Sequence, residues 1–164
     1  MTRLLEMQRF RTMFTGGFAA IVLSILAVPT PAAAQAGQTG QIHLEKVCPP
    51  ATFTGAPGSY CTITFSDLAE IPADVTRVYY DEPTPLPIGK VAFLDSKVVV
   101  YVGPGNWAAG RCTVDFSTGL GLCTVSDGTG MLAGFRARID VRIDYATGVT
   151  HWDGTYRFSP LPAR

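Results

Sequence analysis

The sequence contains little that indicates helices or binding to polyanions. Beyond the first 34 residues, no stretch of ten residues has helical periodicity, which argues against an α-helical domain. Charged residues make up only 16% of the chain. They form no run of Lys and Arg of the kind that binds phosphates or anionic lipid. We therefore expect no nucleic-acid partner.

Motifs of hydrolases and zinc enzymes are also missing. The chain has no G-x-S-x-G nucleophile elbow and no H-E-x-x-H zinc helix. His151 lies near Asp153 in the sequence without an obvious nucleophile, so we interpret this pair as structural. The run from Asp127 to Gly130 (Asp-Gly-Thr-Gly) precedes a strand pattern rather than a helix, and we interpret it as a tight turn, not a phosphate-binding loop.

The N-terminal segment has the layout of a signal peptide. Arg3, Arg9 and Arg11 precede the apolar run 18–28, which has about 11 residues, whereas a bilayer span needs roughly 20. Small residues at Ala32 and Ala34 suit cleavage before Gln35. We expect an exported protein, periplasmic or secreted, with no stable membrane insertion after cleavage. Residues 1–34 are then the signal peptide, 35–41 a flexible lead-in and 42–164 the folded domain.

Export would leave a nearly neutral domain. Loss of residues 1–34 removes three Arg and one Glu from totals of 13 basic and 13 acidic residues, leaving 10 and 12. The remaining 130 residues suffice for one domain with a substantial core.

Four cysteines, an even number, indicate disulfides in an exported chain. The favoured pairing is Cys48–Cys61 and Cys112–Cys123, because residues 112–123 have the pattern of a hairpin that brings its ends together. A two-residue loop would place Cys112 and Cys123 directly opposite, and a three-residue loop diagonally. A metal site is disfavoured, because the spacings are C-x12-C and C-x10-C and only His43 and His151 are available as further ligands.

The last third of the chain shows the clearest strand pattern. From Phe135 to Asp144 apolar and charged residues alternate, which is typical of a strand with one wet face. The pattern breaks at residues 145–148 and resumes to Phe158, so two strands form a hairpin. We expect one parity to face the interior and to supply the candidate ligand-lining residues: Phe135, Ala137, Ile139, Val141, Trp152, Tyr156 and Phe158. Arg136, Arg138 and Arg142 then face water.

The rest of the chain has short β-rich segments separated by Gly, Pro and Asx turns. Strands are expected at 42–47, 60–65, 75–80, 90–102, 107–116 and 120–125, with a bulge or turn at 95–97 in the longest. With the final hairpin this makes about eight strands. We expect an all-β fold, a closed antiparallel barrel rather than a sandwich, since closure removes exposed edges.

Several short motifs resemble the bacterial branch of the allene oxide cyclase-like barrel group, to which plant dirigent proteins are related. They are Leu94-Asp-Ser96, Gly110-Arg-Cys-Thr113, Ser126-Asp-Gly-Thr-Gly130, Leu132-Ala-Gly-Phe135 and His151-Trp-Asp-Gly-Thr-Tyr156. The resemblance covers about residues 42–158. It implies an eight-stranded barrel whose lumen holds an apolar small molecule without a cofactor. The catalytic residues of the plant cyclases have no counterparts that we can place here.

The resulting functional hypothesis is an exported, disulfide-bonded barrel that binds a small hydrophobic molecule, with cofactor-independent cyclase or isomerase activity if it is an enzyme. The alternative is a non-catalytic envelope or interaction protein whose barrel is filled by side chains. In a small eight-stranded barrel both arrangements occur. The sequence leaves the catalytic residues, the ligand and a homo-oligomeric state open.

Overall fold

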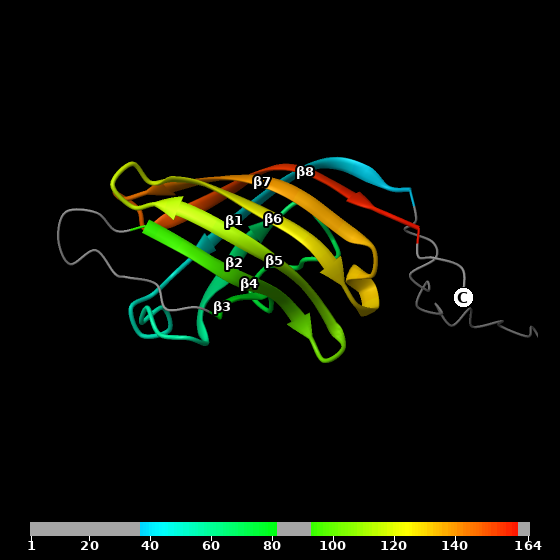
Figure 1. Cartoon of the computed structure of the whole chain (residues 1–164), viewed down its shortest axis with the longest axis horizontal. Helices are drawn as coiled ribbons and strands as arrows, with labels where there is room; N and C mark the ends of the chain where they lie inside the picture. The colour runs from blue at the N-terminus through cyan, green and yellow to red at the C-terminus, as the bar shows by residue number, and fades with distance from the viewer. Residues whose placement is uncertain (1–36, 82–92, 161–164) are drawn as a thin grey trace, which may run out of the picture.

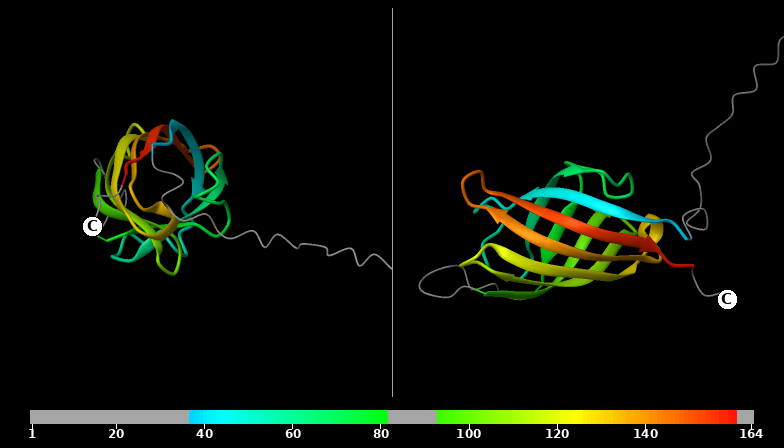
Figure 2. Two further views of the ribbon diagram at one scale, coloured as in Figure 1. Left: turned by 90° about the vertical axis from the view of Figure 1, so that its right-hand side faces the viewer. Right: turned by 90° about the horizontal axis from the view of Figure 1, so that it is seen from above.

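The computed structural model describes residues 37–81 and 93–160. Within them the chain forms eight strands and one short 3-10 turn, and each strand pairs antiparallel with its neighbours until β8 pairs with β1. The fold is therefore the predicted closed barrel (Figures 1 and 2). The predicted signal peptide lies outside the described residues. The elements are β1 (Thr39–Val47), β2 (Ser59–Ser66), β3 (Arg77–Tyr80), β4 (Phe93–Gly103), β5 (Asn106–Asp115), β6 (Leu120–Gly128), η2 (Gly130–Leu132), β7 (Phe135–Asp144) and β8 (Val149–Phe158).

Several details differ from the sequence-based expectations. The strand expected at 75–80 begins at Arg77, and Asp127 and Gly128, expected in a tight turn, are the last residues of β6. The first strand begins at Thr39 rather than Ile42, because residues 39–41 pair with β8, so part of the expected lead-in belongs to the barrel. The bulge or turn expected at residues 95–97 is wrong: β4 runs through them in unbroken register with β5. Ser96 is buried on the inner face, and its hydroxyl donates to the Lys97 carbonyl at 2.9 Å. The sequence suggests an interruption here because Ser96, a polar residue, occupies an inward position of the strand.

The facing predicted for the last hairpin is confirmed. In β7 buried and exposed residues alternate from Phe135 to Arg142, with Ile139 only 1% exposed and its neighbour Arg138 on the outside. In β8 Trp152 and Phe158 are buried, and Tyr156 is half-buried. The turn between the strands contains Gly148 with φ 74°, a left-handed conformation that glycine adopts without steric cost.

Both predicted disulfides are present. Cys48 pairs with Cys61, and Cys112 with Cys123. Cys112 and Cys123 are directly opposite in the β5–β6 register. The turn that joins them spans residues 116–119, longer than either loop considered from the sequence, and ends at Gly119 with φ 73°. Cys61, Cys112 and Cys123 are buried in the core, and Cys48 packs against it. The two disulfides therefore form part of the barrel interior.

The strand order gives the barrel two different ends. One end carries the β1–β2, β5–β6 and β7–β8 connections, and the other carries the β4–β5 turn and η2 (Figure 1). The last residues of β1 and the two disulfides lie toward the first end, which we call the disulfide end. Among the described residues, no helix has the length and apolar character needed to cross a membrane.

Candidate functional site

A lysine occupies the interior of the barrel near the disulfide end. In β1 the inward-facing residues are Ile42, Leu44 and Lys46, which are 2%, 1% and 4% exposed. Lys46 thus continues an apolar stripe, because side chains of alternate residues share one face of a strand. Lysine is almost never fully buried unless it has a partner. The partners of the Lys46 side chain therefore indicate its role.

The ammonium group of Lys46 is held by neutral side chains. Its Nζ donates a hydrogen bond to Tyr80 Oη at 2.5 Å, and lies 5.0 Å from the centroid of the Trp152 ring. The Sγ atoms of Cys48 and Cys61 are 3.7 and 3.8 Å away. None of the contacts among the described residues brings a carboxylate to this nitrogen. Cation–π attraction and one hydrogen bond offset only part of the cost of burying the charge.

This environment shifts both titrating groups toward their neutral forms. Burial lowers the pKa of Lys46 from 10.5 to about 7, and burial also raises the pKa of Tyr80 far above its usual value. At neutral pH a substantial fraction of Lys46 is therefore a free amine, which is a base and a nucleophile. Tyr80 keeps its proton, so its hydroxyl can donate a hydrogen bond in addition to accepting the one from Lys46.

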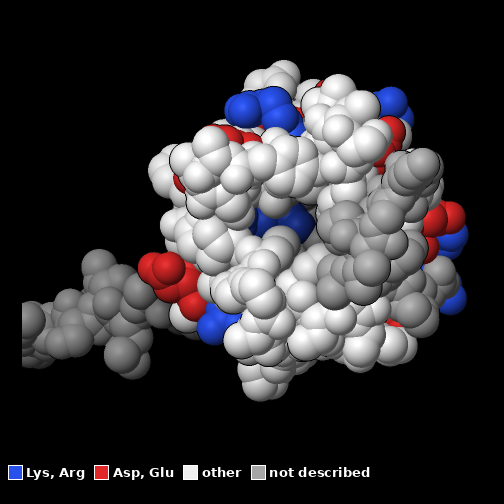
Figure 3. Space-filling view, turned by 90° about the vertical axis from the view of Figure 1, so that its left-hand side faces the viewer, with Lys and Arg blue, Asp and Glu red and all other residues white. Residues whose placement is uncertain are grey.

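Lys46 lines a cavity of about 170 Å³ inside the disulfide end. Both disulfides and mostly apolar side chains form its wall, among them Phe53, Leu94, Val114, Val141 and Trp152. The space-filling view shows a hollow near the centre of this end, with Lys/Arg atoms at its bottom (Figure 3). Among the described residues that line the cavity, Lys46 is the only basic one. The cavity is thus an apolar pocket with one amine and one phenol in its wall.

Trp152 adds a further polar group to the pocket wall. Its side chain is 1% exposed, and its indole Nε1–H has no hydrogen-bond partner among the described residues. A buried donor without an acceptor costs about 1–3 kcal/mol. Because the Nε1 atom itself is fully buried, a ligand oxygen reaches this donor only if the indole ring shifts toward the cavity.

The other half of the lumen is filled. The rings of Phe135, Tyr156 and Phe158 pack on one another with centroid distances of 5.3 to 6.2 Å. Phe135 begins β7 and Phe158 ends β8, so this cluster lies away from the disulfide end. Here the barrel interior is an ordinary packed core.

The predicted ligand-lining residues are therefore divided between the two halves. Val141 and Trp152 line the cavity. The other candidates lie in the core outside it: Phe135, Ala137, Ile139, Tyr156 and Phe158. Sequence reasoning missed Lys46 and did not single out Tyr80 from the other tyrosines. The signal for Lys46 was its parity with Ile42 and Leu44, which places it on the inner face.

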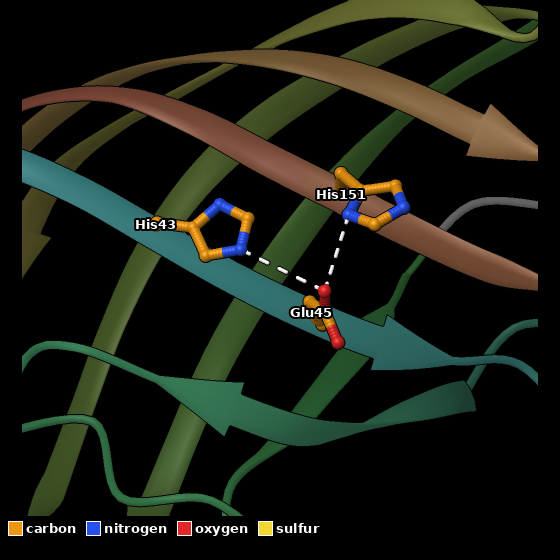
Figure 4. Close-up of side chains that lie close together, drawn as sticks. All are labelled: His43, Glu45 and His151. Atoms are coloured by element: carbon orange, nitrogen blue, oxygen red, sulfur yellow. Dashed lines mark ion pairs between the residues drawn. The ribbon is translucent and has the colours of Figure 1, made fainter.

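The histidines form a separate cluster on the outside of the barrel. His43 and His151 both lie close to the Glu45 carboxylate (Figure 4). His151 Nδ1 lies 3.4 Å from Glu45 Oε1, and Asp153 Oδ1 lies 2.6 Å from His43 Nδ1, so both residues make contacts across the β1–β8 pair. All four cysteines are in disulfides, so they are not available as metal ligands.

The chain matches no protein-family model, and searches of curated proteins and of solved structures found no match either.

Proposed function

We propose that the cavity at the disulfide end binds a small apolar molecule that carries one hydrogen-bond-accepting oxygen. The observation that carries the proposal is the combination of an apolar pocket with two buried donors, Lys46 and the unpaired Trp152 N–H. Ligand sites are typically apolar clefts with a few polar groups that fix orientation. In the proposed complex the ligand oxygen accepts a hydrogen bond from the indole N–H, which orients the ligand.

The size of the cavity limits the ligand. A dry protein cavity of about 150 Å³ accommodates benzene, and this one has about 170 Å³. Pockets for drug-sized ligands begin at about 300 Å³. A single-ring or short-chain carbonyl compound therefore suits the cavity better than a whole fatty acid. The cavity volume therefore restricts the hydrophobic ligand expected from the sequence to small molecules.

The pair formed by Lys46 and Tyr80 suits proton transfer without a cofactor. In the proposed isomerisation the substrate is a β,γ-unsaturated carbonyl compound: the Lys46 amine takes a proton from the α-carbon, and the Tyr80 hydroxyl donates a hydrogen bond to the oxygen of the resulting dienolate. Return of the proton from Lys46 to the γ-carbon gives the α,β-unsaturated isomer. General acid–base catalysis works best when the base has a pKa near the working pH, as the lowered pKa of Lys46 provides. This extends the isomerase activity implied by the resemblance to allene oxide cyclase-like barrels.

Cyclohexanone is the probe for the binding proposal. In a Trp107→Phe background Trp152 is the remaining tryptophan, and we expect its fluorescence to change saturably with added cyclohexanone. Val141→Phe should abolish this response, because the larger ring occupies the cavity. The matched control is Val75→Phe, at a position that is 57% exposed and outside the barrel wall.

Two results would contradict the binding proposal: a flat titration of the Trp107→Phe protein, or an unchanged response when Val141→Phe is added. Either would favour the alternative of a non-catalytic barrel that acts through its loops. The packing of aromatic rings in the other half of the lumen supports this alternative.

We further propose that the protein is exported and that residues 1–34 are removed. The two disulfides support this, because disulfides persist in oxidising compartments. N-terminal sequencing of protein recovered outside the cytoplasm should begin at Gln35 or within about two residues of it. Exported protein that begins at Met1 would contradict the cleavage.

A further inference from the structure

We propose that the outer face of the β1–β8 pair holds a site for one divalent transition-metal ion of the Zn²⁺ type, with His43, Glu45 and His151 as ligands. One ligand atom from each of the three residues lies within 4.8 Å of the others. The site is distinct from the lumen pocket, because these residues occupy the outward parity of their strands, opposite to Lys46 and Trp152.

The sheet itself brings the ligands together. In the β1–β8 register His43 is opposite Asp153, and Glu45 is opposite His151. Residues two apart on one strand and directly opposite on its neighbour share one face at short distance. The four side chains thus form the corners of one small patch on two rigid strands. No loop has to close to assemble it.

The distances suit a metal ion. His43 Nε2 and His151 Nδ1 lie 3.7 and 3.4 Å from the same oxygen, Oε1 of Glu45 (Figure 4). Ligand atoms placed about 2.05 Å from a tetrahedral Zn²⁺ are roughly 3.3 Å apart. Side-chain adjustments of a few tenths of an ångström therefore produce the spacing between Glu45 and each histidine. The remaining position of a tetrahedral ion would be open to water.

Asp153 orients one of the proposed ligands. Its Oδ1 lies 2.6 Å from Nδ1 of His43. With the proton on Nδ1 donated to this carboxylate, Nε2 of His43 is the nitrogen that is free to bind a metal. A carboxylate behind a metal-binding histidine is the usual arrangement in zinc sites. This contact adds a fourth residue, Asp153, to the arrangement and points to the same function.

The charges around the patch favour a cation. Both carboxylate oxygens of Asp67 accept from the backbone N–H of His43 at 3.0 Å. The Asp67 carboxylate therefore lies beside His43, in addition to that of Asp153. From β7, Asp140 lies opposite Asp153, while Arg142 lies opposite His151 and opposes binding. Around the three ligands, the carboxylates of Asp67, Asp140 and Asp153 thus outnumber the one basic group named here, Arg142. Two imidazole ligands favour Zn²⁺, Cu²⁺ or Ni²⁺ over Mg²⁺ and Ca²⁺, which prefer oxygen ligands.

A metal at this place would connect the first and last strands of the barrel. The β1–β8 pairing is the seam that closes the barrel. A ligand that binds only the folded state stabilises that state. The proposed ion would therefore act as a cross-strand clamp on the seam.

The test uses the disulfide-bonded mature protein without a histidine tag. Isothermal titration calorimetry with Zn²⁺ should show one site per chain, and a thermal melt should shift upward in Zn²⁺ but not in Mg²⁺. His151→Ala should lower the affinity at least about a hundredfold, because it removes a ligand. Asp153→Asn should lower it roughly 10- to 100-fold, since it removes only the orienting partner. The control is Asp140→Asn, which removes the same charge from the neighbouring strand and should change affinity less than about fivefold.

Some results would overturn the proposal. They are the absence of a one-to-one Zn²⁺ site, binding that is unchanged in His151→Ala, or equal losses in Asp153→Asn and Asp140→Asn, which would indicate general electrostatic attraction. If the variants do not fold, the wild-type protein still decides the question. Its Cu²⁺ complex should show electron paramagnetic resonance couplings from two imidazole nitrogens, and a spectrum without nitrogen couplings would contradict the assignment.

Discussion

Replacement of Ile139 by Arg is expected to destabilise the barrel severely, by more than about 4 kcal/mol. Ile139 is 1% exposed at the centre of β7, opposite Cys123 on one side and Gly154 on the other. An arginine there would bury a charge without a partner and overfill a packed region. Arg138→Ala, at the next residue of the same strand, changes an exposed side chain and should alter stability by less than about 0.5 kcal/mol.

Urea unfolding followed by circular dichroism compares these two variants with the wild type. The two positions are adjacent in the same strand, so the difference between the variants reports mainly which way each side chain faces. Losses of similar size in both variants would contradict the assigned facing of β7.

Lys46→Met is expected to raise stability at pH 7 and to flatten its dependence on pH. Burial lowers the pKa of Lys46 to about 7 in the folded protein, compared with 10.5 in the unfolded chain. Between these values the unfolded state binds more protons, so the free energy of unfolding of the wild type rises with pH. Below about pH 7 both states are protonated, and the full penalty applies. Methionine fills a similar volume without a charge.

The measurement is urea unfolding of wild type and Lys46→Met at several pH values between 6 and about 9. The wild-type slope should exceed that of the variant by up to about 1.4 kcal/mol per pH unit above pH 7. Lys97→Met, at an exposed position of β4, is the control and should leave the wild-type slope unchanged. Equal slopes for wild type and Lys46→Met would show that the amine is not buried as described.

The features that depend on local periodicity could be predicted from the sequence. Alternation in residues 135–144 predicted both the strand β7 and its inner face, because the side-chain period of a strand is two. The hairpin pattern of residues 112–123 likewise predicted that Cys112 and Cys123 would meet. The short strands were compatible with a sandwich or a barrel; closure into a barrel was favoured because it removes exposed edges, and it was confirmed.

The candidate site was harder to predict, because it depends on which residues go against their usual preference. Lysine residues usually lie on the protein surface because they are charged. The parity of Lys46 with Leu44 nevertheless places its side chain inside the barrel. Ser96 presents the same conflict in β4. The packing of Phe135 and Phe158 in one half of the lumen, which leaves the cavity in the other half, depends on side-chain sizes across the whole barrel. Strand patterns contain no information about it.

The proximity of His43 and His151 also depends on long-range pairing. These residues are brought together by the register between the first strand and the last, which is set only when the barrel closes. The sequence shows that each histidine lies on the outward parity of its strand. It does not show that Glu45 lies opposite His151.

The indole N–H resonance of Trp152 tests the central claim, a ligand-binding pocket in the lumen, most directly. In a ¹⁵N-labelled Trp107→Phe protein one indole cross-peak remains, and it belongs to the donor that has no partner among the described residues. The account predicts that cyclohexanone moves this cross-peak downfield in a saturable manner, with nuclear Overhauser effects between ligand protons and the indole ring, and that Val141→Phe abolishes both. A cross-peak that stays in place throughout the titration, or that moves equally in Val141→Phe, would contradict it.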